Sequence, residues 1–144
     1  MSLEQTAFVE KAIVPDHRAL QAAVDALSFD CKLDDSYTPF KSEGFLPCLL
    51  NGQPSGFEIY FELAAEPLKA FPHRAELVGG RDVAISFRWG GDMAECACVL
   101  IVSAALAKQF NAVIHYQNDD LVYSSEQLTT EAGVALKHAR GRRR

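Results

Sequence analysis

The segment from about residue 93 to residue 110 constrains the fold more than any other part of the sequence. Asp92 is a good N-cap residue, and Glu95 stands three positions later, at the spacing of a capping box, so the segment predicts a helix. From Cys96 to Ala107 it carries no charge, and apolar side chains lie on nearly every side. A helix of this kind is buried on more than one face. We therefore expect a central helix, packed on a sheet and partly covered by other elements.

The same apolar run is too short to be a membrane anchor, because a spanning helix needs about 20 apolar residues. Near the N-terminus, Glu4 and Glu10 lie where a signal peptide has basic residues followed by an apolar run. With 49% hydrophobic and 23% charged residues in a chain of 144, the composition is typical of one packed domain and not of a disordered chain. We expect a soluble, cytoplasmic protein with no membrane partner.

Strand patterns before the central helix predict a β-hairpin. Residues 45–50 form an apolar run and residues 57–63 alternate, while Asn51-Gly52 between them is the strongest turn signal of the chain. Pro47 favours an edge or bulged position in the first of these strands. A further alternating strand is predicted at 82–89, after an irregular connection over 64–80.

A second hairpin is predicted after the central helix, from strands at 112–116 and 121–123. Pro15 and Asp16 favour the start of an early helix, and residues 8–14 before it fit either a short strand or a turn. Ser124 predicts the cap of a last helix over 125–138. Two hairpins indicate an α+β fold: an antiparallel or mixed β-sheet with a buried central helix and flanking helices.

The charge is distributed unevenly along the chain. Five of the 14 basic residues lie in the last eight positions, which leaves nine basic and 19 acidic residues, a net charge of −10, in residues 1–136. We therefore expect a single α+β domain over 1–136 and a basic C-terminal tail over 137–144. An acidic body repels phosphates and attracts basic partners, so no nucleic-acid partner is expected.

The cysteines and histidines match no known spacing for catalysis or metal binding. Cys96 and Cys98 lie two positions apart in a helix and point to different sides, and no cysteine has the paired C-x-x-C spacing of a zinc site. The four are interpreted as small buried apolar residues, with a reactive thiol as the alternative for Cys96 near the start of its helix. The histidines lie outside metal-binding spacings, and the glycine-rich pieces are not phosphate loops. We predict no catalytic residue, no metal site and no cofactor.

A surface pattern remains. In the alternating strand 57–63, the side opposite the core presents Glu58, Tyr60 and Glu62, and Arg88 lies on the equivalent side of the next strand. These glutamates either pair with the arginine across strands or form a protein-binding surface, because Tyr and Arg are enriched in binding hot spots and acidic residues steer basic partners. The residues expected to contact a partner are Glu58, Tyr60, Glu62, Arg88, Asp119 and Asp120.

Short motifs over residues 44–128 carry a resemblance to a known class. They are a Gly-Phe strand, a Trp-Gly-Gly-Asp start of an alanine-rich helix, and a strand that leads into a Tyr-Gln turn. The matching positions are Gly56, Phe57 and Glu58, then Trp89, Asp92 and Glu95, then Tyr116 and Gln117. This pattern resembles immunity proteins of bacterial polymorphic and type VI secretion toxins. The resemblance implies a non-enzymatic inhibitor that binds a cognate toxin in a 1:1 complex, or in a 2:2 complex built on a homodimer.

A second hypothesis comes from a different class. It is a small enzyme or ligand-binding domain with a site near the 115–120 turn, around His115, Tyr116 and Asp119. This hypothesis predicts a concave pocket beside the turn, whereas the inhibitor hypothesis predicts a stable complex without turnover.

Overall fold

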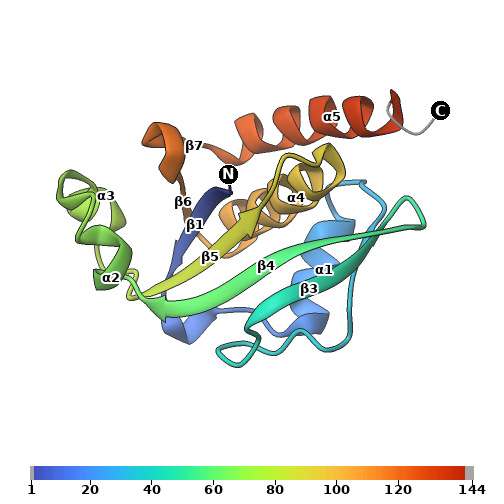
Figure 1. Cartoon of the computed structure of the whole chain (residues 1–144). Helices are drawn as coiled ribbons and strands as arrows, with labels where there is room; N and C mark the ends of the chain where they lie inside the picture. The colour runs from blue at the N-terminus through green and yellow to red at the C-terminus, as the bar shows by residue number, and fades with distance from the viewer. Residues whose placement is uncertain (1, 142–144) are drawn as a thin grey trace.

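Seven strands form one sheet in the order β2-β3-β4-β5-β1-β6-β7, and every neighbouring pair is antiparallel (Figure 1). This computed structural model describes residues 2–141, and the burial of side chains in residues 2–139. The strands are β1 (Leu3–Val9), β2 (Cys31–Leu33), β3 (Gly44–Leu50), β4 (Gln53–Leu63), β5 (Val83–Trp89), β6 (Val113–Tyr116) and β7 (Leu121–Tyr123). The α+β prediction is confirmed, in its antiparallel form.

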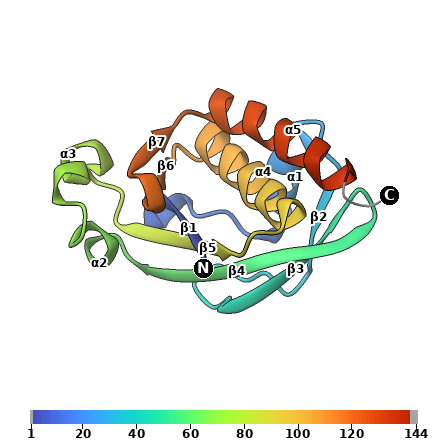
Figure 2. The same ribbon diagram turned by 45° about the horizontal axis from the view of Figure 1, so that its top comes forward.

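The long helices lie together on one face of the sheet (Figure 2). They are α1 (His17–Asp25), α4 (Met93–Gln109) and α5 (Ser125–Gly141). Between β4 and β5 the chain makes two short helices, α2 (Ala65–Leu68) and α3 (Ala75–Val78), which lie at one end of the sheet away from the long helices (Figure 1). Single 3-10 turns occur at Lys11–Ile13, Pro72–Arg74 and Gln117–Asp119.

Helix α4 is the central helix that the sequence predicts. It lies between the sheet and α5 (Figure 2), and its residues from Ala97 to Leu106 are all buried. The Asp92 carboxylate accepts hydrogen bonds from the amides of the first turn. The Glu95 side chain instead reaches the amide of Gly90, at 3.4 Å, so the reciprocal half of the expected capping box is not formed.

The predicted β3–β4 hairpin has a tighter turn than the sequence suggests. Asn51 and Gly52 have φ angles of 52° and 77°, the left-handed pair of a two-residue type I′ turn, so pairing begins again at Gln53. Pro47 is tolerated because β2 pairs only with residues 48–50 of β3. The missing N–H of Pro47 therefore lies beyond the end of the β2 ladder.

Other boundaries differ from the sequence prediction. Strand β1 covers Leu3–Val9 and lies between β5 and β6, whereas the sequence left residues 8–14 undecided. The connection 64–80 is largely helical rather than irregular. Helix α5 continues to Gly141, so the expected domain boundary at 136 falls inside it, and the last residues of the tail, 142–144, lie outside the described residues. Among the described residues, no helix has the length and apolar character needed to cross a membrane.

Candidate functional site

The open face of the sheet brings four of the predicted partner-binding residues to one side. Glu58, Tyr60 and Glu62 of β4 alternate with the buried residues Phe57 and Ile59, and Arg88 of β5 stands directly opposite Glu58. We call Glu58, Tyr60, Glu62 and Arg88 the acidic-aromatic face.

Within this face the side chains contact one another. The Tyr60 hydroxyl donates to Glu58 Oε1 at 2.5 Å, and the Arg88 guanidinium lies over the Tyr60 ring, 5.8 Å from its centroid. Arg88 makes its ion pair with Glu4 of β1, at 2.6 Å, and not with Glu58 or Glu62. The one cation of the face is therefore held by a third carboxylate, and the net charge of the surface stays negative.

Glu62 continues the face toward α2. Partial burial, together with the negative charges of Glu66 and Glu4, raises its pKa above the ordinary value. Repulsion among these carboxylates is locally destabilising, and a basic partner would reduce it.

An apolar strip adjoins the acidic residues on β3. Phe45 stands opposite Glu58 in the ladder and is 59% exposed, and Leu49 of the same strand is 46% exposed. The Phe45 ring lies over Gly56 so closely that a Cβ atom there would come within 2.5 Å of it. Gly56 also has a φ of +151°, so a side chain at this position is strained as well as crowded.

The other two predicted residues, Asp119 and Asp120, lie in the turn between β6 and β7. Asp119 is exposed, whereas the Asp120 carboxylate is engaged within the protein. His115 donates from Nε2 to one carboxylate oxygen at 2.7 Å, and His73 donates to the other at 2.7 Å. Arg74 adds bonds of 3.1 Å to the carboxylate and 2.7 Å to the backbone carbonyl. The role of Asp119 and Asp120 in partner binding stays a prediction.

This cluster fastens the α2–α3 segment to the β6–β7 turn. His115 points outward from the sheet as its strand position suggests, but it is 1% exposed because the Phe71 ring packs on it edge to face at 4.5 Å. The bond from His115, with those from His73 and Arg74, holds the pKa of Asp120 well below its ordinary value. Nε2 of His115 is therefore buried and bonded to Asp120.

Replacement of this carboxylate tests the fastening. Asp120→Asn is expected to lower the thermal unfolding midpoint by a few degrees at neutral pH, and the adjacent exposed Asp119→Asn to leave it unchanged. Because the folded-state pKa of Asp120 lies below the ordinary 3.8, its stabilisation is complete above that pH and is lost as the pH falls further. The difference between wild type and Asp120→Asn should therefore shrink below about pH 4 in calorimetry; a difference that does not depend on pH would contradict it.

An open cavity of about 200 Å³ lies between the sheet and the helices α4 and α5. Trp89, Tyr116 and Tyr123 line it, and the Tyr116 ring is 6.3 Å from each of the other two ring centroids. Gln5 and Trp89 are 1% and 5% exposed, and among the described residues Gln5 Oε1 and Trp89 Nε1 have no hydrogen-bond partner.

The rim of this cavity is acidic. The pKa of Tyr123 is raised by burial and by the charge of Glu131, and the pKa of Tyr116 is raised by burial and by the charge of Asp119. Glu131 itself lines the cavity, and among the side chains that the structure describes no Lys or Arg does. Tyr116 and His115 alternate on β6, so the cavity opens on the opposite side of the sheet from the Asp120 cluster.

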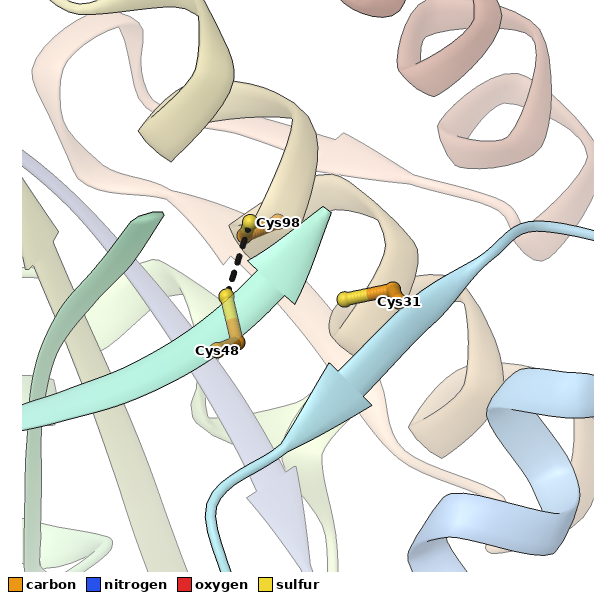
Figure 3. Close-up of side chains that lie close together, drawn as sticks. All are labelled: Cys31, Cys48 and Cys98. Carbon is orange, nitrogen blue, oxygen red and sulfur yellow. Dashed lines mark hydrogen bonds between the residues drawn. The ribbon is translucent and has the colours of Figure 1, made fainter. Parts of the chain in front are cut away.

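Three cysteines form a further cluster that the sequence did not indicate. Figure 3 shows Cys31 of β2, Cys48 of β3 and Cys98 of α4 with their sulfur atoms turned toward one point. All three are buried, and every pair of Sγ atoms lies within 4.8 Å. The interpretation as buried residues is confirmed for these three, whereas Cys96 is only half-buried. The clustering depends on how β2 and β3 pair under α4, and no spacing in the sequence reveals it.

The comparisons with known proteins add nothing to this geometry. No protein-family model, curated protein or solved structure matches the chain.

Proposed function

We propose that the protein is a non-enzymatic inhibitor of the immunity-protein class, which binds a cognate bacterial toxin in the cytoplasm through the acidic-aromatic face. One observation carries the proposal: the long helices cover only one side of the sheet, and the other side presents Glu58, Tyr60 and Glu62 beside exposed Phe45. An apolar strip bordered by uncompensated carboxylates suits a partner that is apolar at its centre and basic around it.

The same residues explain how such a complex is stabilised. Tyr60 and Phe45 are large aromatic groups that are already held in place, by Glu58 and by Gly56, so little side-chain freedom is lost on binding. The carboxylates add electrostatic steering, which accelerates association with a basic surface at low ionic strength.

The proposal is tested by co-purification. The tagged protein is expressed with the product of the gene beside its own, and the pair is analysed by size-exclusion chromatography. We expect a stable complex whose association rate falls as salt is raised. Two proteins that elute separately at low salt would contradict the proposal.

A second candidate function is the binding of a small cationic ligand in the cavity of Trp89, Tyr116 and Tyr123. The aromatic rings and the Glu131 carboxylate that line the cavity favour it. Aromatic rings with an acidic rim recognise ammonium groups, at about 0.5–2 kcal/mol per cation–π contact. Of the residues named in the hypothesis of a site near the 115–120 turn, Tyr116 lines this cavity, whereas His115 and Asp119 do not.

Trp89 makes this candidate directly measurable, because it is the single tryptophan of the chain. Choline is expected to change its fluorescence saturably, whereas the uncharged isostere 3,3-dimethylbutanol should bind about 3- to 30-fold more weakly. Tyr123→Ala should abolish the change, and Tyr60→Ala, on the other side of the sheet, should not. Equal responses to the two probes would contradict a cation site.

A further inference from the structure

The cysteine cluster gathers sulfur atoms from distant parts of the chain. Cys48 Sγ lies 3.0 Å from Cys98 Sγ, and Cys31 Sγ completes a triangle in which no pair exceeds 4.8 Å (Figure 3). Cys31 and Cys98 are 0% exposed, and Cys48 is 3% exposed. The fourth cysteine, Cys96, is half-buried and lines the aromatic cavity instead.

The spacing is close to that of a thiolate metal site. Zinc binds cysteine sulfur at about 2.3 Å in a tetrahedral arrangement, which separates the sulfur atoms by about 3.8 Å. The Cys48 and Cys98 sulfur atoms, at 3.0 Å, are closer together than this, and the remaining pairs lie within 4.8 Å. Shifts of about 1 Å or less, which side-chain rotation supplies, bring the three sulfur atoms to the required separation.

A fourth donor stands next to the cluster. Ser55 lies directly opposite Cys48 in the β3–β4 ladder, and its hydroxyl is buried without a hydrogen-bond partner among the described residues. A tetrahedral ion held by three thiolates has one position left, and the Ser55 hydroxyl, or a water bound to it, lies where it can fill that position.

We propose that Cys31, Cys48 and Cys98 bind one Zn²⁺ ion, with Ser55 or water in the fourth position. The ion fastens the three-residue edge strand β2 to β3 and to the central helix α4. Each Zn–S bond replaces an S–H bond, and the proton passes to solvent.

The test uses the full-length protein, reduced and freed of metal, titrated with Zn²⁺ against a chromogenic chelator. We expect one Zn²⁺ per chain, a higher unfolding temperature with zinc, and a loss of affinity on the order of 100-fold in Cys31→Ser or Cys48→Ser. Cys96→Ser is the matched control and should bind as the wild type does. Retention of full affinity by both cluster variants would overturn the proposal.

A measurement on the wild-type protein tests the proposal even if the variants fail to fold. Co²⁺ in place of Zn²⁺ should give a near-ultraviolet thiolate charge-transfer band and the strong visible absorption of a tetrahedral site, and Zn²⁺ should abolish both. Absorption of octahedral aqueous Co²⁺ only, or less than a tenth of an equivalent of zinc retained by the reduced protein, would contradict a metal site. Isolation of a Cys48–Cys98 disulfide that binds no zinc after reduction would contradict it as well.

Discussion

Reversing two charges of the acidic-aromatic face, Glu58→Arg with Glu62→Arg, is expected to weaken the complex with the partner about 100-fold. The two glutamates supply the negative charge of β4 that faces the partner, and Arg88 cannot compensate for their loss because it is positive itself and bound to Glu4. Both side chains lie at the surface, so the free energy of unfolding should change by less than about 1 kcal/mol.

The matched control separates local contact from overall charge. Glu76→Arg with Glu126→Arg changes the net charge by the same amount, at exposed residues of α3 and α5 that lie outside the face. Titration calorimetry should show nearly wild-type affinity for this pair. If the two double variants weaken binding equally, steering by net charge explains the effect, and the acidic-aromatic face is not the contact surface.

Truncation of the central helix is expected to have the largest effect on stability. Leu106 of α4 is 1% exposed and packs with Phe57 and Phe87 from the sheet, around a small internal cavity. Leu106→Ala removes these contacts from a site that cannot collapse freely, and should lower the free energy of unfolding by about 2–5 kcal/mol. Denaturant unfolding, with an unchanged dependence on denaturant concentration, measures this loss.

Leu63 provides the control for that prediction. It is the last residue of β4 and 68% exposed, so Leu63→Ala removes the same atoms from water-exposed surface. Its effect should stay within about 0.5 kcal/mol. Similar losses for both variants would mean that α4 is not the centre of the core.

Much of the fold could be predicted because local chemistry and tertiary structure agree along most of the chain. The apolar run after Asp92 forms the central helix, Asn51-Gly52 forms the hairpin turn, and Ser124 and Gln127 cap each other at the start of α5. The alternation in β4 and β5 also assigned each side chain to the correct face of the sheet.

What the sequence did not reveal depends on distant pairing. Strand β1 contains the polar residues Gln5 and Thr6, which are typical of exposed positions. Both are buried, and both are hydrogen-bonded: Gln5 donates to Ser103 of α4, and Thr6 accepts from Gln117. Because of these polar residues, the sequence does not indicate that β1 is a central strand of the sheet.

The Asp120 cluster and the cysteine cluster were missed for the same reason. The partners of Asp120, His73 and Arg74, come from the connection over 64–80, which the sequence predicts to be irregular. Cys31, Cys48 and Cys98 meet only once β2 has paired with β3 beneath α4. The spacing of residues along the sequence does not indicate contacts between such distant segments.

The most direct test of the proposed function is a growth assay in a bacterium. The neighbouring gene is induced alone, with the wild-type protein, and with the Glu58→Arg, Glu62→Arg variant. We predict that the neighbour arrests growth alone, that the wild type restores growth, and that the charge-reversed variant restores it poorly although it accumulates in folded form. A neighbour that is harmless alone, or equally toxic with and without the wild-type protein, would contradict the inhibitor proposal.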